Sequence, residues 1–150
     1  MTKYSTGYNL ERYCMLTLAY NGYHICRKPR SLGIEDIVAF NDQNTLLIQV
    51  KKNKRDGRYA LTKIEQEVLK KHAQELGAIP IYLYWEDGQK YWLNLGNGCY
   101  YTGIEQYSTN WLKHRQQTRK MLKDKYRTEG KKSYNTYVLE NWDAVKSFIC

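Results

Sequence analysis

Three residues between positions 33 and 54 have the types and spacing of a site that cleaves phosphodiesters: Asp36, Gln49 and Lys51. A carboxylate and a second oxygen donor can hold a hard divalent cation, and a nearby ammonium can position a water or stabilise charge on a phosphate. Taken singly, an Asp beside a strand and a Lys at a strand end are more often ordinary surface residues. The elements around these residues therefore decide the interpretation.

Two apolar runs, residues 34–40 and 46–50, have the length and composition of buried strands. The sequence Asn-Asp-Gln-Asn at 41–44 predicts a turn between them, because Asn and Asp side chains satisfy nearby backbone groups. Side chains alternate along a strand, so Gln49 and Lys51 are expected on one face and Val50 on the other. The hairpin then brings Asp36 beside them.

The pattern Asp36, then Gln49-Val50-Lys51, resembles the PD-(D/E)XK nuclease signature, with Gln49 at the usual Glu or Asp position. Upstream, Glu11 on a predicted helix and the segment Arg27-Lys28-Pro29-Arg30-Ser31 are similar to the corresponding parts of archaeal Holliday junction resolvases. The resemblance covers residues 7 to 95. Besides Gln49, the chain departs from the family in a shorter link between Ser31 and Asp36.

This resemblance implies roles for the side chains and a bound Mg²⁺ or Mn²⁺. It implies a catalytic set that consists of Glu11, Asp36, Gln49, Lys51 and Ser31, with the metal held by Asp36, Gln49, Glu11 and the Val50 carbonyl. Lys51 would position the water or stabilise charge on the phosphate, and Ser31 would bond a phosphate or shape its turn. A Glu in the first turn of a helix more often simply complements the helix dipole, so Glu11 has a structural alternative.

The charge of the chain favours a polyanionic partner. The sequence has 24 Lys and Arg against 15 Asp and Glu, a formal net charge of +9 with neutral His. Nucleic acid is the expected partner, and an anionic membrane surface is the competing one. The predicted nucleic-acid contacts lie in three clusters: Arg27, Lys28 and Arg30; Lys52, Lys54, Arg55 and Arg58; Arg115, Arg119, Lys120 and Lys123. Each cluster also fits a solvated surface.

The length predicts a single nuclease-like domain, 1–150, with a core at about 7–95 and a basic C-terminal extension at about 105–150. Helices are expected after an N-cap at Asn9 and after a capping box formed by Thr62 and Glu65. Strands are expected at 23–28, 34–40, 46–50, 79–85 and 90–95. This order predicts an α/β fold, a mixed central sheet flanked by helices with a restriction-endonuclease-like αβββαβ core.

Two helices have predicted buried faces. The stripe expected on the helix after Thr62 consists of Leu61, Ile64, Val68, Leu69, Ala73 and Leu76. A basic helix within 111–132 carries nine Lys or Arg and two acidic residues, and its expected apolar edge consists of Trp111, Leu112, Met121, Leu122 and Tyr126. Its other side is either solvated or a clamp for the DNA backbone.

The sequence has no apolar run of about 18 residues and no signal-peptide pattern, so we expect a soluble, cytoplasmic protein of a prokaryotic or virus-infected cell, without a membrane partner. The four cysteines, Cys14, Cys26, Cys99 and Cys150, form no Cys-x-x-Cys pair. They predict reduced thiols rather than a zinc site or a disulfide framework.

Three functional hypotheses remain open at this point. The first is a metal-dependent DNA endonuclease like the junction resolvases, acting as a homodimer on branched or four-way DNA. The second is a nucleic-acid-binding protein whose nuclease site has decayed at Gln49, because losing a carboxylate weakens a magnesium site. The third is a nuclease of the same superfamily with another DNA target, such as a nicking, restriction-like or viral repair enzyme.

Overall fold

A computed structural model describes residues 3–27, 35–51, 60–128 and 134–145 of the chain. It divides into two compact units, Met1–Glu105 and Gln106–Cys150, and each is described by itself. The expected organisation as a single domain stays a prediction. No helix in the described ranges combines the length and the apolar character needed to cross a membrane.

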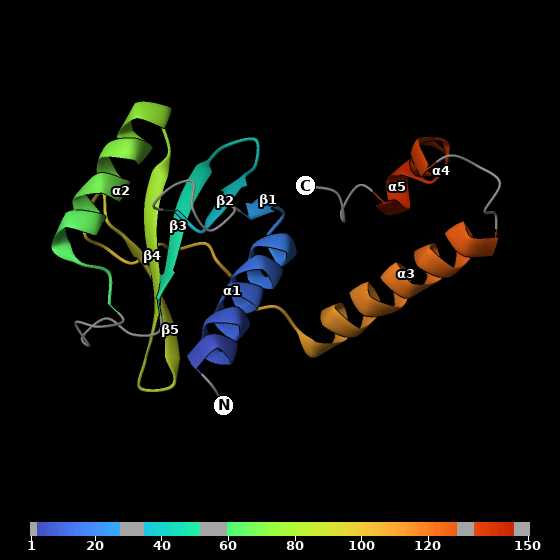
Figure 1. The fold of residues 1–150 in the computed structure, drawn as a ribbon, viewed down its shortest axis with the longest axis horizontal. Helices are drawn as coiled ribbons and strands as arrows, with labels where there is room; N and C mark the ends of the chain where they lie inside the picture. The colour runs from blue at the N-terminus through green and yellow to red at the C-terminus, as the bar shows by residue number, and fades with distance from the viewer. Residues whose placement is uncertain (1–2, 28–34, 52–59, 129–133, 146–150) are drawn as a thin grey trace. The chain divides into compact units, whose positions relative to one another are not determined.

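The first unit is a five-stranded mixed sheet between two helices (Figure 1). Its elements are α1 (Lys3–Tyr20), β1 (His24–Arg27), β2 (Ile37–Phe40), β3 (Thr45–Lys51), α2 (Lys63–Leu76), β4 (Ile79–Glu86) and β5 (Gln89–Asn94). The strands lie in chain order, and β3 and β4 are parallel while the other neighbouring pairs are antiparallel. Helix α2 makes the crossover between the parallel strands. The predicted α/β fold is confirmed.

The sheet separates two apolar cores. Leu46, Ile48 and Val50 of β3 pack with Leu10, Cys14 and Leu18 of α1, whereas Leu47 packs with Leu69 and Ala73 of α2. Strand β3 therefore alternates between the two faces, as its sequence predicts. The spacing of four residues along α1 gives that helix its buried stripe.

The predicted start of the first helix is wrong. The helix begins at Lys3, and Asn9 lies within it rather than at its N-cap. Residues 3–8 contain no proline, and extending a helix that is already nucleated costs far less than starting one. The apolar face after Asn9 anchors the helix, and the polar residues before it extend the same helix.

The predicted stripe of α2 is wrong in part. Leu61, Leu69 and Ala73 are buried, but Ile64 and Val68 are 77% and 50% exposed, and Leu76 is also exposed. Ile64 precedes Leu69 by five residues, which turns its side chain about 140° round the helix. Helix α2 therefore carries an apolar face towards the sheet and a second one on its outer side.

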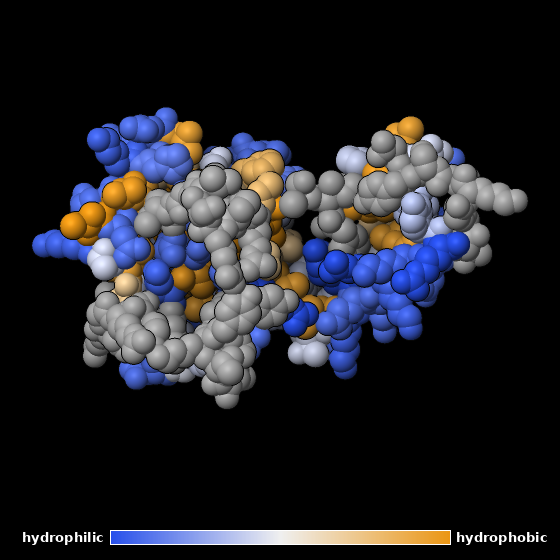
Figure 2. Space-filling model, viewed as in Figure 1, coloured by the Kyte–Doolittle hydropathy of each residue, from blue (hydrophilic) through white to orange (hydrophobic). Residues whose placement is uncertain are grey.

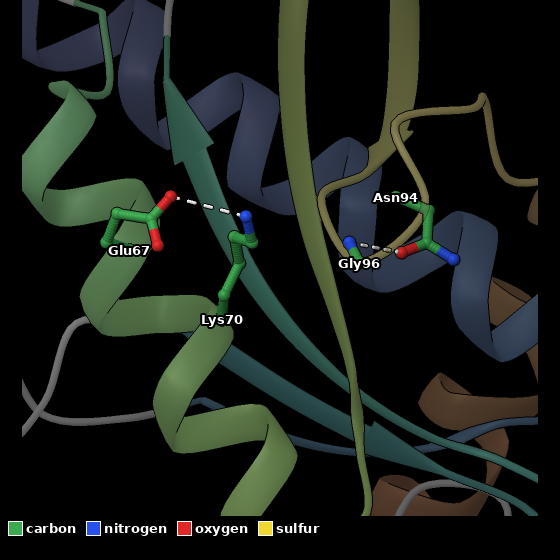
Figure 3. Close-up of polar contacts among 4 residues, drawn as sticks. All are labelled: Glu67, Lys70, Asn94 and Gly96. Atoms are coloured by element: carbon green, nitrogen blue, oxygen red, sulfur yellow. Dashed lines mark hydrogen bonds and ion pairs between the residues drawn. The ribbon is translucent and has the colours of Figure 1, made fainter.

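Local signals set the ends of these elements. Thr62 and Glu65 form the predicted capping box, and Gly77 ends α2 in the left-handed region with a φ of 66°. Asn41 Oδ1 accepts hydrogen bonds from the backbone N–H of Gln43 and Asn44, which closes the predicted β2–β3 turn. Figure 3 shows the ion pair between Lys70 and Glu67 on the outside of α2, and the turn after β5, where Gly96 N donates to Asn94 Oδ1 at 2.8 Å.

The second unit has a small core of its own. It contains α3 (Thr109–Thr128), α4 (Tyr134–Glu140) and α5 (Trp142–Val145). Leu122, Tyr137 and Val145, one from each helix, are buried together, and the Tyr137 hydroxyl donates to the Leu122 carbonyl at 2.6 Å. Met121, predicted on the packed edge of α3, is instead exposed, because it precedes Leu122 by one residue and points about 100° away from it.

Candidate active site

Asp36 is tied to the β3 backbone on both sides of Gln49. Its Oδ2 accepts a hydrogen bond from Val50 N at 2.9 Å, and its own N donates to the Ile48 carbonyl at 2.8 Å. The β2–β3 register pairs Ile48 with Ile37, so Asp36 and Ile37 both face Ile48. Two residues opposite one is the arrangement of a β-bulge, which re-aims side chains and is common beside active sites. The predicted proximity of Asp36 to the 49–51 strand is found.

Gln49 directly precedes Val50, the residue whose backbone N–H binds the Asp36 carboxylate, and it carries a buried side-chain oxygen. Its residue exposure is only 7%, and its Oε1 has no hydrogen-bond partner among the residues that the structure describes. A buried carbonyl oxygen without a partner costs on the order of 1–3 kcal/mol. A cation or a water at this oxygen would remove that cost. Lys51, which ends β3, is half-buried, and Val50 between them packs into the core beside α1.

Glu11 lies on α1, about one turn before Cys14. The Cys14 thiol is fully buried, and burial raises its pKa well above the ordinary value. The carboxylates of Asp36 and then Glu11 raise the same pKa further. Both carboxylates are therefore near enough to act on the Cys14 thiol, which packs in the core beside α1.

These donors fit a hard cation, with one negative charge fewer than a set of three carboxylates. Two carboxylates and one amide oxygen are all oxygen ligands, which suit Mg²⁺ or Mn²⁺. No group of three His, Cys, Asp or Glu side chains able to hold a metal occurs in the described ranges. The neutral Gln49 is consistent with that finding, since it stands where a third carboxylate would be. The role of the Val50 carbonyl stays a prediction.

Glu35 is a buried acid that the sequence analysis missed. It is 3% exposed, and its Oε1 lies 3.5 Å from His72 Nε2 of α2. Strict alternation would put Glu35 on the same face as Ile37, whose side chain packs in the core beside α1. The bulge at Asp36 reverses that parity and turns Glu35 towards α2. The signal in the sequence is an acidic residue directly before Asp36 inside an apolar run.

The predicted nucleic-acid contacts are only partly within the described structure. Ser31 and the cations Lys28, Arg30, Lys52, Lys54, Arg55 and Arg58 lie outside the described residues, and Arg27 ends β1. Arg119, Lys120 and Lys123 are exposed on α3. Arg115 differs, because it is half-buried with its guanidinium carbon 5.5 Å from the centre of the Trp111 ring. Burial, and then the neighbouring Arg119, lower the pKa of Arg115.

Comparisons with known proteins identify relatives of the first unit. The family described as "Archaeal holliday junction resolvase (hjc)" matches residues 2–96. Fifteen chains of solved structures match, among them Hjc of Archaeoglobus fulgidus, a Holliday junction resolvase from an archaeal hyperthermophile. It is 27% identical to this chain, with a TM-score of 0.50, over 59% of this chain and 72% of the other. A search of curated proteins found no match.

Proposed function

The chain belongs to the archaeal Holliday junction resolvase family, and we propose that Asp36, Gln49, Glu11 and Lys51 form the site at which it cuts DNA. By family and by fold it is a junction-resolving endonuclease, and nucleases of this family depend on a metal. The observation that carries the proposed site is the Asp36 carboxylate held to Val50 N of β3, one residue after Gln49 with its buried oxygen. The proposed substrate is a four-way or otherwise branched DNA.

Each residue has a separate task in this proposal. Asp36 and Glu11 supply the negative charge that holds Mg²⁺ or Mn²⁺, and Gln49 adds a neutral oxygen. A bound cation of this kind lowers the pKa of a water and offsets charge on the phosphate. Lys51 stabilises the negative charge that develops on the phosphate, because its ammonium ends the same strand. The hydrogen bond from Val50 N holds the Asp36 carboxylate in place before substrate binds.

Asp36→Ala and Lys51→Ala test this assignment. Both variants should lose cleavage of a four-way junction while binding it within several-fold of wild type, because they remove chemistry and leave most phosphate contacts. Cleavage gels with Mg²⁺ or Mn²⁺ and gel shifts with chelator measure the two properties on the same preparations. Lys125→Gln, which removes one exposed positive charge from α3 outside the proposed site, is the control for loss of one positive charge. Normal cleavage by both variants would refute the site.

The proposed active form is a homodimer, since two strands of a four-way junction need two related cuts. The outer face of α2 supports it. Ile64 and Val68 are exposed there, beside a shallow groove of about 510 Å³ lined also by Lys63, Glu67 and Lys71. A surface with apolar residues and both charge signs is self-complementary, because a two-fold axis can set a lysine of one copy against Glu67 of the other.

A further inference from the structure

The second unit, Gln106–Cys150, lies outside the family match at 2–96 and contributes no residue to the proposed site. It nevertheless carries a concentrated positive charge. Helix α3 holds seven Lys or Arg residues and a single acidic residue, Asp124. A helix with that imbalance, attached to a DNA-cutting unit, needs an explanation of its own.

One face of α3 is used for packing. Trp111, Arg115, Thr118, Leu122 and Tyr126 are its buried or half-buried residues, together with Leu112. Their spacing of three or four residues places them on one stripe. Leu122 packs with Tyr137 and Val145, and Arg115 lies over the Trp111 ring. The side chain of Arg115, which was predicted to bind nucleic acid, therefore already packs against Trp111 within its own unit.

The opposite face carries a row of exposed cations. Lys113, Lys120 and Arg127 are spaced seven residues apart and therefore lie nearly in line along the helix. Round the helix axis they are about 140–180° from Leu122. Successive members are about 10 Å apart along the axis, and the row is about 21 Å long, which equals roughly six base pairs of duplex. Lys123 flanks this row, and the surface over α3 is hydrophilic along the helix in Figure 2.

We propose that this row, Lys113, Lys120 and Arg127, binds the phosphate backbone of a duplex arm, so that residues 106–150 form a second DNA-contacting unit of the chain. The proposal rests on DNA being the substrate, as proposed above, but not on the activity of the Gln49 site. Contacts of this kind read no sequence, and they add affinity through release of counterions.

An anionic membrane is the alternative partner for a basic helix, and the structure disfavours it. A helix that lies in a membrane interface inserts its apolar face between lipids. In α3 that face is covered, because Leu122 is buried against Tyr137 and Val145 and its carbonyl accepts the Tyr137 hydroxyl. The exposed face of α3 is cationic. Among the described residues of this helix, Met121 is the large apolar residue that is exposed.

The full chain with Lys113→Gln and Lys120→Gln tests the proposal. Fluorescence anisotropy with labelled duplex DNA and with a four-way junction, in chelator and across a salt series, gives the slope of log affinity against log salt. Each lost phosphate contact should make that slope less negative by about 0.9, so the double variant should change it by about 1.8. Asp124→Asn, which removes the negative charge beside the row, should tighten binding.

Lys125→Gln is the matched control, since it removes the same charge from the same helix. Lys125 Nζ is hydrogen-bonded to Asn141 Oδ1 at 2.8 Å within the unit, so this variant should leave the slope unchanged. Circular dichroism checks that all variants keep their helices. An unchanged slope in the double variant, or an equal change in Lys125→Gln, would overturn the proposal. So would binding to phosphatidylserine vesicles that the double variant loses while its DNA slope stays at the wild-type value.

Chelator keeps the two proposals separable. Binding is read without cleavage, so an inert Gln49 site leaves the expected slope change in place. Conversely, Asp36→Ala should abolish cleavage and keep the wild-type salt slope. If the double variant keeps the wild-type slope while Asp36→Ala loses cleavage, only the proposal for the α3 row fails. If the slope changes while Asp36→Ala still cuts, only the proposed cleavage site fails.

Discussion

Replacing Gln49 with Glu should convert a weak cation site into a strong one at a cost in the metal-free protein. The new carboxylate would have nearly the size of the amide, at a position that is 7% exposed and directly precedes Val50, the residue whose N–H binds Asp36. For two such charges about 5–10 Å apart and an effective dielectric constant of about 20, the repulsion is about 2–3 kcal/mol. Relaxation and protonation reduce this, so we expect a loss of about 1–3 kcal/mol without metal.

The sign of the pH dependence follows from that repulsion. Asp36 and burial should raise the pKa of the new carboxyl in the folded state above its unfolded value of about 4.3. A carboxyl with a raised folded pKa destabilises the protein at high pH, and the effect disappears as the pH falls below the unfolded pKa. The stability difference between Gln49→Glu and wild type, without metal, should therefore be largest above neutral pH and small near pH 4.

Divalent metal should reverse this loss. A ligand at about 100 times its dissociation constant stabilises a protein by about 2.7 kcal/mol, which for this chain length raises the melting temperature by about 5–10 °C. We expect that shift in Gln49→Glu and a smaller one in wild type, measured by thermal unfolding with and without chelator. In junction cleavage, Gln49→Glu should need less metal or turn over faster than wild type.

Gln43→Glu is the control for the added charge, because Gln43 is exposed in the turn of the same hairpin. If Gln49→Glu and Gln43→Glu melt alike with and without metal, and neither Gln49→Glu nor wild type cuts a junction, the buried oxygen is not part of a cation site. A wild type inert at every metal concentration, together with an active Gln49→Glu, would identify a decayed site on an intact scaffold.

Two further predictions concern other parts of the first unit. Val68→Asp should shift the protein from dimer to monomer in sedimentation, with Lys71→Gln as a milder change in the same groove, and a dimer that persists in Val68→Asp would exclude the outer face of α2. The Tyr101 pKa is raised to about 12, first by burial and then by the hydrogen bond with Tyr23, so the folded state favours the neutral phenol. Stability should then fall as the pH rises from about 10 to 12, and Tyr101→Phe should flatten that decline in alkaline unfolding curves, whereas an unchanged curve would contradict it.

The features predicted correctly from the sequence are those set by neighbouring residues. The capping box at Thr62 and Glu65 and the turn that Asn41 closes need only local hydrogen bonds. The strand alternation around Gln49 needs only a period of two. These signals are sufficient for the hairpin and for the approach of Asp36 to β3.

The features that were missed depend on contacts between distant residues. Apolar periodicity identifies Ile64 and Val68 as a face of α2, but which face meets the sheet depends on how Leu69 and Ala73 pack against β3 and β4. Likewise, the face of the sheet towards which Glu35 points depends on a bulge that forms only when β2 pairs with β3. The residue pattern of a single segment therefore predicts neither the packed face of α2 nor the direction of the Glu35 side chain.

The bulge also explains how residue 49 can differ from the family pattern without loss of the scaffold. Both hydrogen bonds between Asp36 and β3 use backbone atoms of β3, the Val50 N–H and the Ile48 carbonyl. The side chain at position 49 takes part in neither, so a Glu or a Gln there leaves these two bonds in place. The Asp36 carboxylate is thus positioned by the main chain, and the side chain at position 49 sets the total charge of the proposed donor set. For that reason we expect Gln49→Glu to change metal affinity and rate in the Asp36 site while β2 and β3 keep their register.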